Sequence, residues 1–447
     1  MCFSAIISSM IKIQKAEEIE DDFFNGRNFG PSIDTVRQVL EEVRLKKDEA
    51  LRVYGKKFDN STLTHFEISH ADLENAAKKM QATNPKLYDA LCYSRDLALR
   101  FAKKQRESFD SFEIELEPGL FTGQKNISVD RAGVYVPAGR FPLLSSVVMT
   151  VTPAVAAGVK EIILCTPPRP NPNSDEPYAD ENIMAAAYIC GVTKAFAVGG
   201  AQAIAAMAFG TESIPQTDVI VGPGNKYVAE AKKLVYGTVG IDMIAGPTEV
   251  FIIADKSANP EWVAADLLAQ AEHDIVAQPV LATPDENLAQ AVAKEIEKQL
   301  EVLPTREIAG QSIANYGRII ITKDLDQAAQ IANRKAPEHL ELALDEGADR
   351  DRLVQSVHNY GSLFIGHGAA EVFGDYAAGL NHTLPTSGSA RFTGGLSVRV
   401  FLKTVTTLRT VTGSKGSEAS AQAAGALGDA EGLAGHAKAA RLRLADR

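Results

Sequence analysis

The sequence predicts an α/β protein with two Rossmann-like parallel-sheet domains and a small helical C-terminal segment. Short continuous runs of Val, Ile and Leu alternate with Ala-rich helical stretches, and the runs fall into two clusters. Such runs suit strands buried on both faces, and their alternation with helices is typical of βαβ units. The first cluster comprises residues 133–136, 161–165, 195–198 and 219–221, and the second comprises 250–254, 280–282, 318–321, 340–344 and 363–365.

Helical periodicity precedes the first cluster. Residues 33–56 repeat apolar side chains at helical spacing, with Ser32 as a possible N-cap and Gly55 near the far end, and residues 71–107 show the same pattern. A further helix is predicted over residues 260–271. Residues 413–435 are dominated by Gly, Ala and Ser, which alone indicates a flexible linker, and a helical pattern returns at 435–444.

Composition excludes several classes of protein. A chain of 447 residues has room for about two to four domains. The formal net charge of -11 disfavours nucleic-acid binding, because an acidic surface repels a phosphate backbone. No apolar run approaches the roughly 20 residues that a membrane helix needs.

Cysteine usage indicates a reducing compartment, and we expect the cytoplasm. None of the four cysteines forms a CxxC pair, and the start of the chain has no basic region or small-residue cleavage site typical of a signal peptide. Met10 is a plausible alternative start, which would leave residues 1–9 untranslated. The cysteines are Cys2, Cys92, Cys165 and Cys190, of which the last two lie in apolar segments and are expected to be buried.

Two motifs place metal-ligating or proton-carrying side chains together. Gln270 and His273 lie at positions i and i+3 at the end of a predicted helix, where both could ligate zinc, although a helix C-terminus also favours a histidine without any metal. Glu338 directly precedes His339, so that one site could hold two proton carriers, or a surface carboxylate could simply adjoin a buried imidazole.

Other polar residues follow glycines. Asp375 and His382 lie in a Gly-flanked segment that could be a functional loop or ordinary turn chemistry, and Glu431 and His436 lie in the tail, where exposure to solvent is the simpler interpretation. Ligands of open α/β sheets bind beyond the carboxyl ends of strands, where the turns 199–202 and 222–225 could approach a phosphate. The remaining histidines, His65, His70, His358 and His367, are interpreted as structural.

Taken together, the ordered segments resemble the histidinol dehydrogenase family from about residue 30 to the C-terminus. No G-x-G-x-x-G, Walker or G-x-S-x-G motif competes with that interpretation. The matching stretches are Gly133-Val-Tyr-Val-Pro137, Gly199-Gly-Ala-Gln202, Gly222-Pro-Gly-Asn225, Ala245-Gly-Pro-Thr-Glu249, Gln270-Ala-Glu-His273, Ala336-Pro-Glu-His-Leu340 and Gly374-Asp-Tyr-Ala-Ala-Gly-Leu-Asn-His-Thr-Leu-Pro-Thr386.

The resemblance implies an NAD-dependent, four-electron oxidation of L-histidinol through L-histidinal to L-histidine in histidine biosynthesis. One zinc per subunit would be held by Gln270, His273, Asp375 and His436. His339 would take the alcohol proton and Glu338 would activate water, as base catalysis requires. NAD contacts would fall on Tyr135, Gln202 and Asn225, and substrate contacts on Thr248, His382 and Glu431, alongside the zinc ligands and His339.

The resemblance also implies a homodimer with shared sites, in which the C-terminal segment reaches the partner. The expected parts are an N-terminal extension at 1–30, a discontinuous first domain from 31–133 and 250–395 with most of the metal and catalytic site, an NAD-binding domain at 134–249, and an arm at 396–447. Glu431 and His436 would then act in trans, with 413–430 as the segment that carries them across.

Departures from the family pattern keep a second substrate open. Ala138-Gly139 and Thr248 replace a common Gly-Gly and Ser, and Arg140 could contact either cofactor phosphates or a surface carboxylate. A sister group in the same fold oxidises a sulfonated propanediol, but Glu431 suits a substrate ammonium and would repel a sulfonate. A catalytically dead metal- or nucleotide-binding module is a third possibility, which the presence of every implied ligand and both proton carriers disfavours.

Overall fold

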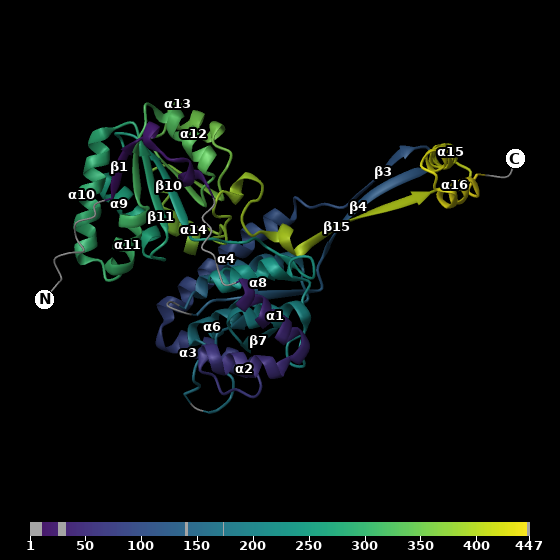
Figure 1. The fold of residues 1–447 in the computed structure, drawn as a ribbon, viewed down its shortest axis with the longest axis horizontal. Coiled ribbons are helices and arrows are strands. Elements are labelled where there is room, and N and C mark those ends of the chain that lie inside the picture. Colours follow the sequence, from purple (N-terminus) through teal and green to yellow (C-terminus); the bar gives the residue numbers. More distant parts are fainter. Residues whose placement is uncertain (1–10, 26–32, 139–141, 173, 445–447) are drawn as a thin grey trace.

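Two α/β lobes and a projecting arm make up the chain. The computed structural model describes residues 11–25, 33–138, 142–172 and 174–444. Figure 1 shows the two lobes side by side, with an antiparallel hairpin leading away from them to a pair of helices near the C-terminus. The predicted fold class, parallel sheets covered by helices, is confirmed, and the arm adds a third, antiparallel sheet.

The first sheet is built from the second half of the chain, apart from one edge strand that comes from the N-terminal residues. Its six strands pair in parallel in the order β1-β12-β11-β10-β13-β14. Helices α9–α11 pack on one face and α12 and α13 on the other. The strands are β1 Lys12–Lys15, β10 Glu249–Ala254, β11 Gln278–Thr283, β12 Arg318–Ile321, β13 His339–Ala343 and β14 Ser362–Ile365; the helices are α9 Pro260–Ala271, α10 Glu286–Val302, α11 Arg306–Tyr316, α12 Leu325–Lys335, α13 Ala348–Ser356 and α14 Glu371–Tyr376.

The second sheet has the order β2-β7-β6-β5-β8-β9, in which only the short edge strand β2 is antiparallel to its neighbour. Its strands are as continuously apolar as predicted, because helices cover both faces. The strands are β2 Glu67–Ile68, β5 Arg131–Tyr135, β6 Glu161–Thr166, β7 Lys194–Ala197, β8 Val219–Val221 and β9 Gly240–Ile241; the helices that follow them are α5 Leu144–Ala157, α6 Glu181–Cys190, α7 Gly200–Phe209 and α8 Lys226–Val235.

Four N-terminal helices complete this second lobe, and here the predicted domain grouping is wrong. Val36 and Leu40 share a buried core with Ile204, and Leu73 shares another with Ile183, so residues 33–106 pack on the sheet of 131–241 and not on that of 249–365. The predicted extension instead supplies β1, the edge strand of the other sheet. The four helices are α1 Ile33–Lys46, α2 Asp48–Asp59, α3 His70–Thr83 and α4 Pro85–Arg106.

Both long N-terminal helices predicted from periodicity are broken in two. Lys47 has a φ of 54°, which an α-helix cannot accommodate, and it separates α1 from α2. Pro85 begins α4, and Asn84 before it is held out of the helical region and caps Leu87 through its side chain. Ser32 lies outside the described residues, so its proposed capping role is not addressed by the structure.

The arm contains a helix, Lys415–Ala430, where low complexity alone indicated a flexible linker, so that expectation is wrong, whereas the helical pattern predicted at 435–444 is confirmed. The small residues allow close packing: a Cβ on Gly428 would lie 2.9 Å from the backbone nitrogen of Ala437. Helix α15 therefore needs glycine to contact α16. The arm consists of β3 Phe112–Glu117, β4 Leu120–Ser128, β15 Leu402–Thr410, α15 Lys415–Ala430 and α16 Ala434–Arg441.

Short 3-10 turns connect the larger elements: Ala16–Glu18, Asp21–Phe24, Ser389–Arg391 and Val398–Phe401. Within the described ranges, no helix has the length and apolar character needed to cross a membrane. Cys165 and Cys190 are free and buried, as predicted, and burial raises the pKa of the Cys190 thiol to about 12.

Candidate functional site

His339 begins strand β13 at the amino edge of its sheet, beside the start of β10, and Glu338 directly precedes it. Glu338 Oε2 accepts hydrogen bonds from the backbone nitrogen of Glu249 at 2.9 Å and from the Thr248 hydroxyl at 2.5 Å. Parallel pairing of β10 and β13 sets Val250 opposite His339, so these two sequence motifs meet although 90 residues separate Thr248 from Glu338. Both predicted proton carriers are buried.

The two ring nitrogens of His339 face different partners. Nδ1 lies 3.1 Å from the carbonyl oxygen of Glu249, and Nε2 lies 3.4 Å from Oδ1 of Asp375. A carbonyl oxygen can only accept, so Nδ1 carries a hydrogen. In the neutral ring Nε2 then holds the free electron pair, and it is a buried atom without a hydrogen bond of good geometry. This is the arrangement of a general base that points toward Asp375.

Gln270 and His273 lie at the end of α9, which runs back from β10 to the same amino edge. Gln270 is buried against Thr248 and Glu371, whereas His273 is exposed one turn later. Ligands of open α/β sheets usually bind beyond the carboxyl ends of the strands. Here the side chains lie at the opposite edge, because they come from the starts of strands and the end of a helix.

Asp375 on α14 and His382 after it complete the group within one chain. His382 Nε2 lies 3.2 Å from the hydroxyl oxygen of Ser145, on α5 of the other lobe. Asn381 donates to the carbonyl oxygen of Met149 at 2.6 Å on the same helix. The group of site residues therefore lies where the two lobes meet.

Burial and clustered carboxylates shift the protonation of this site. Burial raises the pKa of Glu338 to about 7, although His339 opposes the shift. Burial alone would lower the pKa of His339, but Glu338, Asp375 and Glu371 raise it well above its usual value. Burial would raise the pKa of Asp375, but its contact with His339 lowers it overall. Burial also raises the pKa of Glu371 well above its usual value, so a bound cation would stabilise the ionised forms of the carboxyl groups gathered here.

The residues expected to contact NAD occupy the carboxyl edge of the other sheet. Tyr135 ends β5 and its hydroxyl accepts the backbone nitrogen of Gly200 at 3.0 Å; Gln202 follows β7 and donates to Asp59 at 3.1 Å. Asn225 follows β8, is exposed, and caps α8. All three therefore surround helix N-termini, where phosphates bind readily. Arg140 lies outside the described residues.

Glu431 and His436 are not brought to this group within one chain. Glu431 directly follows α15, His436 lies in α16, and both are exposed. Figure 1 shows these helices at the far end of the hairpin, away from α14 and α9.

The residue types gathered here suit zinc, but one chain does not bring together all four of the expected ligands. Among the described residues, no three His, Cys, Asp or Glu side chains gather as a metal site. However, Asp375 Oδ1 is buried without a hydrogen bond, and Gln270 and His273 add an amide oxygen and an imidazole nitrogen, which are ligands that zinc accepts.

Sequence reasoning missed two buried residues of this site. Glu249 forms an ion pair of 3.0 Å with Lys335 and accepts the backbone nitrogen of Ser387 at 2.6 Å. Glu371 contacts Gln270 and lies 4.0 Å from His339 Nδ1. Its spacing of four residues from Asp375 would have placed both carboxylates on one helix face.

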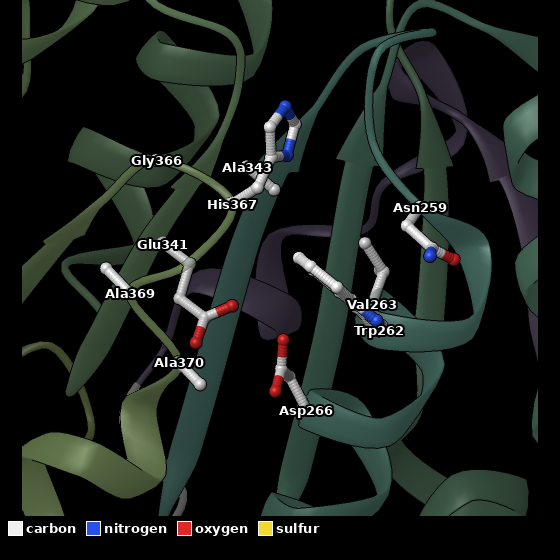
Figure 2. A pocket seen from close by; sticks show the side chains of 10 residues that line it. All are labelled: Asn259, Trp262, Val263, Asp266, Glu341, Ala343, Gly366, His367, Ala369 and Ala370. Atoms are coloured by element: carbon white, nitrogen blue, oxygen red, sulfur yellow. The ribbon is translucent and has the colours of Figure 1, made fainter.

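A second pair of acids, the half-buried Asp266 and the buried Glu341, lies near the site. Figure 2 shows the carboxylates of Asp266 and Glu341 facing one another in a small pocket near Trp262. Burial raises the pKa of Asp266 to about 6. Burial and Asp266 together raise the pKa of Glu341 to about 8. The folded chain therefore holds protons that the unfolded chain releases near pH 4.

Stability should consequently depend on pH through Glu341. The pKa of Glu341 is higher in the folded chain than in the unfolded chain. Its contribution to the free energy of unfolding is therefore fully present below about pH 4.5 and is lost as the pH rises through about 8. The Glu341→Gln variant cannot lose a proton at this position, so its stability should gain on that of wild type as the pH rises. The difference in free energy of unfolding between variant and wild type, measured by urea unfolding, should be larger at pH 9 than at pH 5 by about 1–3 kcal/mol. The exposed Glu297→Gln is the control; parallel curves for wild type and Glu341→Gln would contradict the assignment.

Comparison with known proteins identifies the family. A model of the family described as histidinol dehydrogenase matches residues 27–444. The chain belongs to the histidinol dehydrogenase family. It is 45% identical over 419 residues to the histidinol dehydrogenase of Streptococcus mutans, with 92% of each chain covered. It is 43% identical over 433 residues to that of Thermus thermophilus, with 96% of this chain and 100% of the other covered.

A solved structure supports the same family at the level of the fold. The crystal structure of histidinol dehydrogenase from Elizabethkingia anophelis superposes with a TM-score of 0.88 at 35% sequence identity. The match covers 97% of this chain and 98% of that one. The resemblance drawn from ordered motifs is therefore confirmed, and with it the prediction of an oxidoreductase.

Proposed function

We propose that this protein is a zinc-dependent histidinol dehydrogenase that oxidises L-histidinol through L-histidinal to L-histidine with two NAD. Membership of the family gives the reaction class. The observation that carries the proposal is the buried pair Glu338–His339, with His339 Nε2 directed at Asp375. A base and a carboxylate on adjacent residues suit two successive oxidations at one carbon.

His339 would act in the first oxidation. Its Nδ1 hydrogen is held by the carbonyl oxygen of Glu249, which leaves Nε2 to take the proton of the substrate hydroxyl while the hydride leaves to NAD. Surrounding carboxylates stabilise the imidazolium so formed.

Glu338 would act in the second oxidation. Its ionised carboxylate would take a proton from the water that adds to the aldehyde, and the second hydride would leave to a second NAD. Burial raises the pKa of Glu338 to about 7, so it can hold and release a proton near neutral pH. Thr248 contacts its Oε2 and would align the carboxylate toward substrate.

The metal ligands would be Gln270, His273 and Asp375 of one chain with the His436 of a second copy. A zinc ion held there would supply a Lewis acid for the amine and imidazole nitrogens of the substrate. Glu431 would meet the substrate amino group and His382 would lie beside it. NAD would bind at the sheet edge that holds Tyr135, Gln202 and Asn225. A homodimer follows from this ligand set, and localisation to the cytoplasm stays a prediction.

The stoichiometry of NADH tests the proposal. Wild-type protein with zinc and excess NAD should form two NADH for each L-histidinol consumed, with L-histidine as product. One NADH with an aldehyde product would contradict the second oxidation. Turnover of a sulfonated or other small diol, with no NADH from L-histidinol, would retain the chemistry but assign another substrate.

A further inference from the structure

Glu371 lies against the side-chain amide of Gln270, and the proposed reaction gives it no role other than its charge near His339. Both residues are about 1% exposed, so their contact is sheltered from water. One end of the amide contacts both oxygens of Glu371, at 2.7 and 3.2 Å, and the other end contacts the hydroxyl of Thr248.

The chemistry of these neighbours decides which end of the amide is the nitrogen. Both carboxyl oxygens of Glu371 face this end of the amide, and a carboxyl group always has at least one oxygen that can only accept, so this end is assigned as the –NH₂ group. The amide oxygen is then turned away from Glu371, toward Thr248. The Thr248 hydroxyl has only one hydrogen, and it can donate that hydrogen to Glu338. The amide oxygen of Gln270 then accepts no hydrogen bond from Thr248 and is available to a metal ion.

We propose that Glu371 is a positioning residue that holds the Gln270 amide with its oxygen free to bind the metal ion. The inference rests on the proposed function, since it assigns Glu371 a role only if Gln270 is a zinc ligand. A carboxylate that accepts the N–H groups of an amide also increases the negative charge on its oxygen, and such partners of metal ligands strengthen metal binding.

The backbone fixes Glu371 in this place. Its own backbone nitrogen donates to Oε1 of Glu341 at 2.9 Å, which anchors the start of α14 to β13. Asp375, four residues later on α14, presents its carboxylate to His339. One short helix thus carries a proposed metal ligand and the residue that orients another, so the two are held in register by helix geometry.

Zinc affinity tests the proposal without reference to turnover. Zinc alone is titrated in competition with a chromogenic chelator, on the full-length protein. Glu371→Gln should weaken zinc binding by about 10–100-fold, because one neutral amide cannot accept both N–H groups of another. Glu371→Asp keeps the carboxylate, but its side chain is shorter by one methylene and no longer reaches the amide, so it should also weaken zinc binding.

Two comparisons separate positioning from a general loss of charge. Asp266→Asn neutralises an acid that acts on Glu371 through space but is not a hydrogen-bond partner of the Gln270 amide, whose partners are Glu371 and Thr248, so it should change zinc affinity by less than about twofold. In a Gln270→Ala background, Glu371→Gln should have almost no further effect, because the residue acts through Gln270. Thermal unfolding of each variant shows whether it is folded.

Failure of the inference differs from failure of the proposed function. If wild type binds no zinc at about one ion per chain, the metal assignment is wrong. If wild type binds zinc and Glu371→Gln binds it equally well, or if the loss is as large in the Gln270→Ala background or for Asp266→Asn, the positioning role is wrong. Should Glu371→Gln not fold, Glu371→Asp decides between the same outcomes.

Discussion

Replacing His339 with asparagine is expected to lower kcat for NADH formation from L-histidinol by about 10²–10⁴-fold, the usual contribution of a general base. Asparagine can still contact the carbonyl oxygen of Glu249 but has no group that accepts the alcohol proton. The zinc content should be unchanged, because His339 faces Asp375 from outside the proposed ligand set. Steady-state kinetics and metal analysis of the same preparation measure both quantities.

A matched histidine provides the control. His358 is exposed and its Nδ1 contacts the carbonyl oxygen of Ser356, so His358→Asn repeats the chemistry of the substitution outside the site. It should retain wild-type kcat. If His339→Asn kept near-normal activity, the base would have to be another residue, and Glu338 would be the first to replace.

The parts of the fold that the sequence predicted well are those in which local and tertiary signals agree. Helix α9 begins and ends at the predicted residues 260 and 271, because Asn259 caps it, Pro260 begins it and an apolar face packs on β10. The buried parallel strands were also found within about two residues, since helices on both faces require continuous apolar runs.

The elements that the sequence did not predict lack a pattern of this kind. Strand β3 is exposed at every position, so no alternation of buried and polar residues marks it. Grouping residues 31–133 with the wrong sheet failed for a different reason: amphipathic helices show which face is buried, but not the sheet that covers it. In α15, glycines needed for close packing resembled a linker.

In the candidate site, sequence motifs identified polar side chains that stand out from the residues around them. They did not identify side chains whose role becomes visible only once their burial in the folded chain is known. Glu338, His339, Gln270 and Asp375 were named in advance, and the structure places them together. Glu371 was not, because a glutamate in a short helix is ordinary until its partner is known. Its burial against Gln270 is a property of the folded chain alone.

Mixing two inactive proteins should restore activity if the arm completes the site of a partner. His339→Asn and His436→Asn are each expected to be inactive as homodimers. A heterodimer joins an intact His339 from one chain to an intact His436 from the other, which makes one good site in two. After random exchange of subunits, recovery should reach about a quarter of the wild-type rate.

The control uses two substitutions on the same lobe. His339→Asn mixed with Glu338→Gln leaves every site with one defect, whichever chains pair, so no recovery is expected. Recovery there would mean that the active sites are not assembled as proposed. Absence of recovery for the first pair, with exchange shown by mass spectrometry, would place His436 in the site of its own chain.

That last outcome would require a large change of structure, which makes the experiment decisive. Helices α15 and α16 pack on one another, α15 also contacts β3, and the antiparallel strands that carry them lead away from both lobes (Figure 1). Bringing His436 to Asp375 of the same chain would need this hairpin to fold back, breaking the pairing of β4 with β15 over nine residue pairs. If a second copy supplies His436, that pairing stays intact, and the arm would serve to present two closely packed helices to the partner.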